Sequence, residues 1–308
     1  MRRLLTLLLL ATTALAQHAA PPAFDVASVR PSGHGSVQRS NVPLDNGNVY
    51  GTIASDDARA AEGGLFLATH QPLWRYISFA YKLSGTQELA FRFSYFSGAP
   101  RSGAPLWVTG SFDAAPEFFD ISARAPNDTT LNQMRLMMQT LLADRFGLRV
   151  HTVDADAPVF ALILAAPGIT GPHLQPHPAS DPCTVPAPAS PLGELPPACG
   201  VIAHVPSDLP GQHYGARAVP IALLATSLPT MTGLAVISRP VVDQTGLPGL
   251  YDFNLTWMHS LTAEDAAVAD STEAFRDALR NQLGLKLQPT HAPLSFLILD
   301  HVEQPSAN

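Results

Sequence analysis

The sequence predicts an α+β protein made of two related halves, each a β-α-β-β unit in which helices cover one face of a small sheet. Two junctions carry nearly the same residues, FGLRV at Phe146–Val150 and LGLKL at Leu283–Leu287. Each junction follows an apolar stripe at helical spacing and precedes a run of strand-forming residues. Further upstream, FFDIS from Phe118 matches LYDFN from Leu250. The repeated order of these features indicates an internal duplication.

The first unit is expected to contain one capped helix and two strands. Thr130 and Gln133 have the T-x-x-Q spacing of a capping box, and Gly147 is placed for a left-handed C-cap. Between them, six apolar residues form one buried stripe: Met134, Met137, Met138, Leu141, Leu142 and Phe146. We expect a strand at residues 148–151, a turn at 154–158 and a strand at 159–165.

The second unit repeats this plan. Its helical stripe is formed by Phe275, Ala278, Leu279 and Leu283, and Gly284 ends the helix. We expect a strand at residues 285–288, a turn at 291–293 and a strand at 294–300. Pro158 then matches Pro293, and the tripeptide LIL at 162–164 matches LIL at 297–299.

The composition favours a folded protein without a nucleic-acid role. The chain has 308 residues, of which 46% are hydrophobic and 14% charged, so a sizeable core is available. The formal net charge is -7 and no strongly basic stretch occurs, which gives nucleic acid nothing to bind electrostatically.

The first residues predict export. MRRLLTLLLLATTALAQ has two arginines, a short apolar run and an Ala-Leu-Ala site before Gln17, which is typical of a signal peptide at residues 1–16. No later segment is apolar enough to span a membrane, so the mature protein is expected to be soluble. We expect an N-terminal half at 17–170, a proline-rich linker or insertion at 171–212 and a C-terminal half at 213–308.

The two cysteines, Cys183 and Cys199, both lie in the insertion. An even number of cysteines in an exported protein predicts a disulfide. Closing a loop of this size stabilises a fold by about 3 kcal/mol in the chain-entropy model.

Two histidines in the same segment raise the question of a metal. His173 and His177 precede Asp181 and Cys183, but prolines on both sides exclude a helix that would put the two rings on one face. A loop site stays open. A solvated linker with chance histidines is favoured, so no metal and no cofactor are assigned.

No catalytic residue is assigned either. The sequence has no convincing G-x-S-x-G, S-x-x-K, H-E-x-x-H or phosphate-binding loop. Asp154 and Asp156 are expected in a turn, where aspartate is common for local reasons. Asp120 and Asp252 occupy matched positions of the two halves, which predicts a shared structural task such as a hydrogen bond at a strand start.

One aromatic segment is a candidate interaction surface. In FRFSYFSG, the side chains of Phe91, Phe93 and Tyr95 would share one side of a strand. A core strand is the default interpretation, whereas an exposed aromatic strip would suit a peptide or a glycan.

The assembled motifs resemble a known family. FDVASVRPS, FDISARAP, MRLMMQTLLADRFGLRVH, RPVVDQTGLPGLYDFNLTW and LGLKLQPTHAPLSFLILDHVEQPSAN are similar to the soil-associated family of exported bacterial proteins, and the match spans Phe24 to Asn308. That family has no established activity, so the resemblance implies no catalytic residues. Residues from Pro220 to Leu299 also resemble, in pattern, the short N-terminal domain of secretins and TonB-dependent receptors. This second resemblance implies a periplasmic protein-interaction module.

The sequence therefore leads to an expected class of function. We expect an exported binding or protein-interaction module in the periplasm or outside the cell, whose partner is an envelope protein or a peptide or glycan ligand. The alternative is a secreted hydrolase that acts on an extracellular polymer. A pocket with a perturbed acid or base beside a nucleophile would favour the hydrolase.

Overall fold

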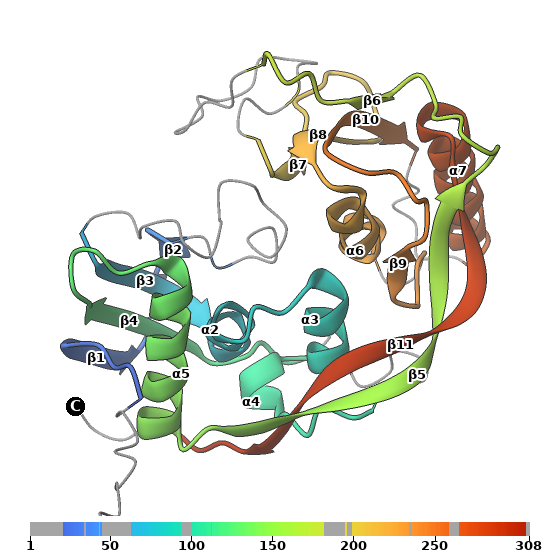
Figure 1. Cartoon of the computed structure of the whole chain (residues 1–308). Coiled ribbons are helices and arrows are strands. Elements are labelled where there is room, and N and C mark those ends of the chain that lie inside the picture. Colours follow the sequence, from blue (N-terminus) through green and yellow to red (C-terminus); the bar gives the residue numbers. More distant parts are fainter. Residues whose placement is uncertain are drawn as a thin grey trace, which may run out of the picture.

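The computed structural model describes residues 21–33, 35–42, 44, 63–93, 100–111, 113–181, 195, 199–233, 236–258 and 265–305, with side chains described from residue 271 in the last range. The expected leader, Tyr95 and Cys183 lie outside these ranges. Within them the chain is an α+β protein with three sheets, and two lobes are joined by a long ribbon (Figure 1). No helix of the described residues is long and apolar enough to cross a membrane.

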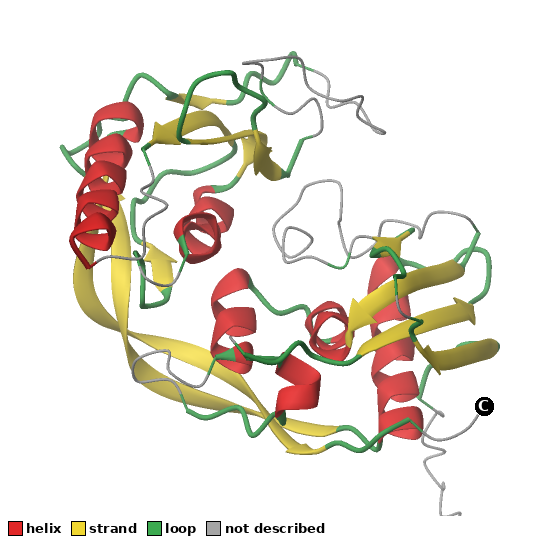
Figure 2. Cartoon of the chain, turned by 180° about the vertical axis from the view of Figure 1, so that it is seen from behind, coloured by secondary structure: helices red, strands yellow, loops and turns green. Residues whose placement is uncertain are grey.

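The N-lobe is an antiparallel sheet of order β1-β4-β3-β2, with α5 across one face (Figure 2). Its elements are β1 (Val26–Pro31), β2 (Arg39–Ser40), β3 (Leu65–Pro72), α2 (Leu73–Ala80), α3 (Gly85–Arg92), α4 (Leu106–Thr109), β4 (Phe118–Arg124) and α5 (Leu131–Phe146). The expected capping box is confirmed, because Thr130 Oγ1 accepts a hydrogen bond from Gln133 N at 3.2 Å. Gly147 ends the helix with a φ of 58°. Phe146 then packs edge-on against Phe119 of the sheet.

The C-lobe has the same strand order. Its elements are β6 (Leu174–Pro176), β7 (Ile202–His204), β8 (Gln212–Val219), α6 (Ile221–Thr232), β10 (Tyr251–Trp257) and α7 (Asp265–Leu283). The order β6-β10-β8-β7 places β6 where the N-lobe has β1, β10 at β4, β8 at β3 and β7 at β2. This equivalence supports the internal duplication. The segment at 171–212 also differs from a plain linker, since it supplies β6 and β7 to the sheet.

The ribbon consists of β5 (Arg149–Leu164) and β11 (Leu285–His301), which pair antiparallel along their length, with β9 (Val241–Asp243) parallel to β5. The predictions of turns at 154–158 and 291–293 are therefore wrong, because each strand is continuous through these residues. The LIL tripeptide of each strand pairs instead with the start of the other strand, as Leu162 with Leu287 and Leu297 with Thr152. The two copies thus exchange partners rather than folding into separate hairpins.

The prolines that suggested turns fit the ribbon because their nitrogens face outward. Phe160 of β5 donates its backbone N–H to the carbonyl of Pro240, which lies outside the β5–β11 pair. Every second residue of a strand directs its nitrogen to the same side, so the nitrogen of Pro158 also points away from β11. Pro293 is in register with Asp156, whose nitrogen points to this same side. Proline at these positions removes no hydrogen bond of the ladder.

The exchange joins the two hydrophobic cores. The N-lobe core contains Leu297 and Leu299 of β11, and the C-lobe core contains Leu162 of β5. Helix α3 adds a second link, because Thr86 Oγ1 donates to the carbonyl of Val241 at 3.5 Å and Gln87 Nε2 donates to that of Ser295 at 3.1 Å. Each lobe therefore depends on residues from the other half of the chain.

The aromatic candidate surface needs correction. Phe91 lies in α3 rather than in a strand, and its exposed fraction is 1%. The helix forms because Ser84 and Gln87 make a capping box, with Gln87 N donating to Ser84 Oγ at 3.3 Å. Phe93 is the C-cap of this helix, and Tyr95 lies outside the described residues. Phe91 is thus a core residue and presents no aromatic strip.

Candidate functional site

The matched aspartates of the two lobes perform the same task. Asp120 Oδ1 accepts a hydrogen bond from the backbone N–H of His70 at 2.8 Å, and Asp252 Oδ1 accepts one from the N–H of Ala218 at 2.8 Å. His70 and Ala218 have φ values of 52° and 51°, and each lies where the register between the two strands shifts. The expected shared hydrogen bond is confirmed. It satisfies the N–H group at a bulge just before α2 and α6.

The C-lobe adds a histidine to this aspartate. His177 Nδ1 lies 2.7 Å from Asp252 Oδ1, and the backbone N–H of His177 donates to the carbonyl of Leu250 at 2.8 Å. The residue at the same position in the N-lobe is Ser32, whose N–H donates to Phe118 at 2.8 Å. The ring of His177 is thus a feature of the second copy alone.

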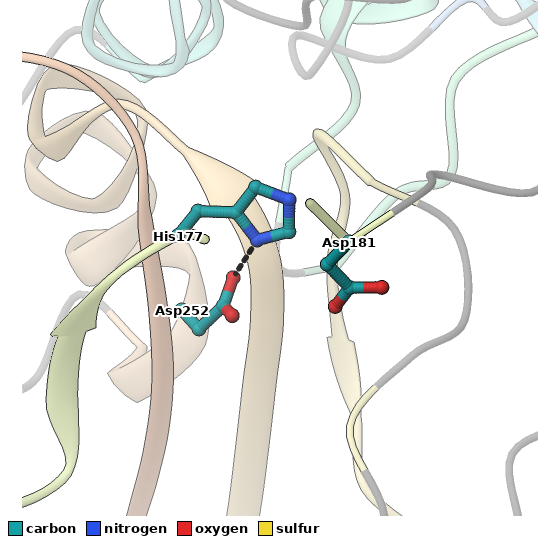
Figure 3. A group of neighbouring side chains, drawn as sticks. All are labelled: His177, Asp181 and Asp252. Atoms are coloured by element: carbon teal, nitrogen blue, oxygen red, sulfur yellow. Dashed lines mark hydrogen bonds and ion pairs between the residues drawn. The ribbon is translucent and has the colours of Figure 1, made fainter. Parts of the chain in front are cut away.

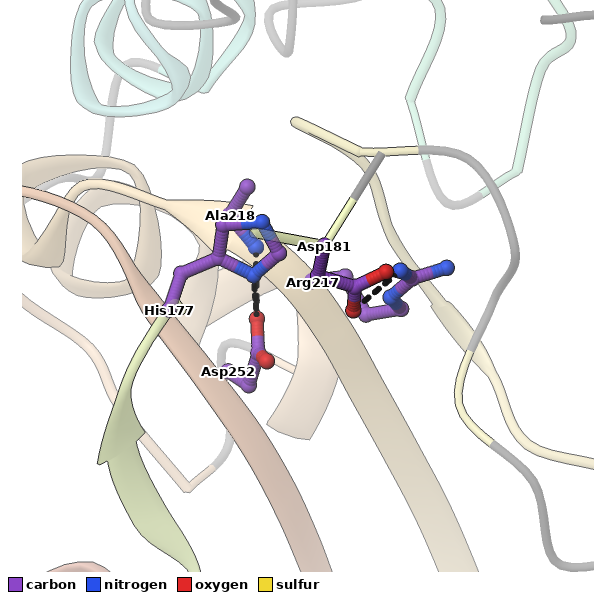
Figure 4. Close-up of polar contacts among 5 residues, drawn as sticks. All are labelled: His177, Asp181, Arg217, Ala218 and Asp252. Carbon is purple, nitrogen blue, oxygen red and sulfur yellow. Dashed lines mark hydrogen bonds and ion pairs between the residues drawn. The ribbon is translucent and has the colours of Figure 1, made fainter. Parts of the chain in front are cut away.

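Asp181 approaches the same place from the turn after β6. Its carboxylate forms an ion pair with Arg217, which lies on β8 directly before Ala218 (Figure 4). The backbone N–H of Asp181 donates to Pro178 at 3.0 Å, which closes the turn that presents the carboxylate.

Three donor groups converge here. One ring nitrogen of His177 and one carboxylate oxygen from each of Asp181 and Asp252 lie within 4.8 Å of one another (Figure 3). The His177 side chain is 9% exposed, whereas Asp181 is more open to solvent. The sequence had brought His177 and Asp181 together as a possible loop site. The sequence does not predict that Asp252 belongs to the same site, because Asp252 lies on a strand far along the chain. For Asp252 the sequence predicts only a structural task.

The other described residues that the sequence suggested as metal ligands or acid–base groups do not lie at this site. His173 contributes its backbone N–H to the carbonyl of Gln282 at 2.9 Å and is not part of the three-donor cluster. Cys199 is buried, and Cys183 lies outside the described residues, so the disulfide stays a prediction. Asp154 contacts Ser295 across the ribbon instead of occupying a turn.

The N-lobe has a different polar contact at the matched position. Ser32 Oγ lies 3.0 Å from His70 Nδ1, and the His70 ring stacks on Phe118 with centroids 4.2 Å apart. Asp120 binds the backbone N–H of His70 rather than its ring. The three residues therefore do not form the relay in which a carboxylate orients the imidazole of a serine–histidine pair.

A buried tyrosine of α2 binds the backbone of β4 next to the N-lobe aspartate. Tyr76 donates its hydroxyl hydrogen bond to the carbonyl of Phe119 at 2.9 Å. Burial raises the pKa of Tyr76 well above its ordinary value, and the charge of Asp120 raises it further. The phenol consequently stays protonated and holds α2 against β4.

The sheet faces that lie opposite the helices differ between the lobes. On β8, a Cβ added to Gly215 would meet Leu195 at 2.7 Å and Val205 at 2.8 Å, so aliphatic side chains of the insertion cover this face. Leu67 of β3 occupies the corresponding position, since Gly215 and Leu67 precede the prolines of α6 and α2 by the same number of residues. Leu67 is 43% exposed. The same face is thus covered in the C-lobe and exposed in the N-lobe.

The comparisons with known proteins identify a family but no activity. A family model described as "Protein of unknown function (DUF3738)" matches residues 75–302, which run from within α2 to just beyond β11 and so include the C-lobe and the part of the N-lobe that follows β3. No curated protein and no solved structure matches the chain. The resemblances to soil-associated proteins and to the secretin and TonB-receptor domain stay predictions.

Proposed function

The chain belongs to the DUF3738 family, whose function is unknown, and we propose that it is an exported binding or protein-interaction module of the periplasm or the cell exterior. The single observation that carries this proposal is the exposed N-lobe sheet face around Leu67. The C-lobe serves as an internal reference, because its equivalent face holds an apolar segment of the same chain.

The exposed face has an apolar centre. Leu67 is joined by Val26 of the edge strand, which is 71% exposed. Val26 and Leu65 are both in register with Arg124 of β4, so they flank it on one side of the sheet. Covering the two aliphatic side chains of Leu67 and Val26 would stabilise a complex by about 1 kcal/mol each.

The charges on the face define the partner further. Arg124 and Arg30 are both exposed, and both lie on the side of the sheet that carries Leu67. Carboxylates opposite these guanidinium groups would speed association and fix the register of a partner. The partner that fits is an extended peptide segment of an envelope or secreted protein that carries aliphatic and acidic side chains.

The test uses two matched variants of the mature protein. Leu67→Glu places a charge on the exposed face, and Leu136→Glu places one on α5, across the sheet, at a residue that is 40% exposed. Proteins captured from envelope extract by the immobilised wild-type chain are identified after cross-linking. We expect a captured protein that Leu67→Glu loses and Leu136→Glu retains. Equal capture by both variants, capture of glycan alone, or no capture by the wild type would contradict the proposal.

The contact between Ser32 and His70 favours a hydrolase as the second candidate function. A serine beside an imidazole is the minimum arrangement for an activated nucleophile. The wild type and Ser32→Ala are therefore treated with a fluorophosphonate probe, which labels activated serines. Labelling of Ser32 would support the hydrolase, and a wild-type chain that stays unlabelled would rule out this nucleophile.

A further inference from the structure

We propose that His177, Asp181 and Asp252 form a binding site for a divalent transition-metal ion in the C-lobe. This inference goes beyond the proposed binding function and does not depend on it, because the metal site and the exposed sheet face lie on different lobes. Zinc is the probe ion of choice, since one imidazole nitrogen with carboxylate oxygens is among its common ligand sets.

The distances between the three donor atoms require only modest shifts. The three donor atoms lie within 4.8 Å of one another, and the His177 Nδ1 to Asp252 Oδ1 distance is 2.7 Å. Ligand atoms around one zinc ion are separated by about 3–3.5 Å, given bonds of about 2.0–2.2 Å. The pair on the sheet side is joined by a hydrogen bond shorter than this separation, so the ion has to displace the shared proton and move the two atoms slightly apart, while Asp181 has to move closer. It lies in a turn, where a small backbone shift is easily made.

Backbone hydrogen bonds fix the positions of Asp252 and His177. The N–H of Ala218 donates to Asp252, and the N–H of His177 is fixed to the edge of β10 at Leu250. Groups that orient ligands in this way are a usual part of protein metal sites. The imidazole also keeps one nitrogen available to an ion, because among the described residues Nε2 of His177 has no hydrogen-bond partner and is reached by solvent.

Arg217 competes with the metal ion for the carboxylate of Asp181. Its guanidinium group pairs with Asp181 and supplies one positive charge beside two carboxylates. With a neutral imidazole, the group of four therefore carries a formal charge of about -1. A divalent ion would change this to about +1, so binding is expected to release Arg217 from Asp181. The ion pair consequently lowers the metal affinity.

The N-lobe provides a control within the same molecule. It has the matched aspartate, Asp120, but Ser32 stands where the C-lobe has His177. The backbone task of the aspartate is thus fulfilled without an imidazole. The presence of His177 and Asp181 around Asp252 is not explained by that task alone.

The experiment measures zinc binding to the mature chain after treatment with a chelator. Isothermal calorimetry is expected to show one saturable site, and zinc is expected to raise the melting temperature because it binds the folded state. Asp181→Asn and His177→Ala should each weaken binding by at least about tenfold. Arg217→Gln should strengthen it several-fold, a result that a merely structural ion pair would not produce.

Asp120→Asn is the matched control and should bind zinc as the wild type does. If His177→Ala fails to fold, Asp181→Asn still decides, because Asp181 lies in an open turn and its loss is not expected to unfold the lobe. The proposal is overturned if the wild type shows no saturable binding at millimolar zinc. It is also overturned if Asp181→Asn binds zinc as tightly as the wild type.

Discussion

Asp252 accepts the backbone N–H of Ala218 at 2.8 Å, and Ala218 holds a φ of 51°. A non-glycine residue in this left-handed conformation costs about 1–2 kcal/mol. Asp120 and His70 repeat the arrangement in the N-lobe, again at 2.8 Å. The carboxylate therefore stabilises the bulge that turns each strand into the following helix, and both copies of the unit depend on it.

Replacing the N-lobe carboxylate is expected to destabilise the protein. Asp120→Ala leaves the N–H of His70 without its acceptor, which should lower the free energy of unfolding by about 1–3 kcal/mol. Urea denaturation followed by circular dichroism measures the change. Asp128→Ala is the control, because Asp128 is exposed and its loss should change stability by less than about 0.5 kcal/mol. Equal midpoints for the two variants would show that the bulge does not need the carboxylate.

The capped helix, the repeat and the shared task of the two aspartates could be predicted from the sequence because they rest on local patterns. The capping box at Thr130, the glycine at 147 and the matched aspartates all appear in short stretches of sequence. The exchange of strands was not accessible. In the sequence, a proline such as Pro158 favours the prediction of a turn. A continuous strand tolerates Pro158 because its nitrogen points away from the paired strand, and this direction is known only from the structure.

Only part of the three-donor cluster could be predicted from the sequence, because the cluster also depends on strand pairing. His177 and Asp181 are neighbours along the chain, so a loop site was considered. Asp252 joins them only because β6 pairs with β10. Sequence spacing carries no information on that pairing.

The exchanged ribbon predicts that the N-lobe cannot fold without the end of the chain. A chain that stops after Leu283 lacks β11 and hence Leu297 and Leu299, which belong to the N-lobe core. In the full-length chain, Leu297→Ala should destabilise the N-lobe by about 2–5 kcal/mol. With Trp257→Phe as background, the tryptophans that remain lie in the N-lobe, and their fluorescence follows its unfolding.

Leu294→Ala is the control for this prediction. Leu294 is only partly buried, on the same strand, and does not belong to the N-lobe core. Its removal should therefore cost less than that of Leu297. A truncated chain whose N-lobe still melts cooperatively would show that the exchange is dispensable.

Tyr76 predicts a loss of stability at alkaline pH. Burial, with help from the Asp120 charge, raises the pKa of Tyr76 above its ordinary value of 10.0. The unfolded chain therefore loses this proton at a lower pH than the folded chain does, so the stabilisation is complete below pH 10 and declines as the pH rises further. Melting temperatures measured from pH 8 upward should fall most steeply above pH 10.

Tyr76→Phe should make that alkaline decline shallower while lowering stability near neutral pH by about 1 kcal/mol, because the hydrogen bond to Phe119 is lost. Tyr214→Phe is the comparison, since burial raises the pKa of Tyr214 as well but Tyr214 is less buried. An alkaline decline that is unchanged in Tyr76→Phe would assign it to other groups.

The leader predicts cleavage before Gln17. Small residues at positions 14 and 16 suit signal peptidase, so Ala16→Phe should leave unprocessed precursor, whereas Ala19→Phe, beyond the expected cleavage site, should be processed normally. N-terminal sequencing and fractionation of cells that produce the protein measure both outcomes. Recovery of the full-length chain in the cytoplasmic fraction would contradict export.

The cysteine pair predicts that reduction destabilises the insertion. Cys199 is buried and bridges to β8 at Arg217, so a bond to Cys183 would tie the segment between them to the sheet. Reductant should lower the free energy of unfolding by about 3 kcal/mol, and the Cys183→Ser/Cys199→Ser double variant should have this lower stability with or without reductant. Thiol titration of the unfolded, unreduced chain gives a direct check: two free thiols would show that the bond does not form. Because Asp181 lies just before Cys183, the same reduction should also loosen the turn that presents Asp181 to Arg217.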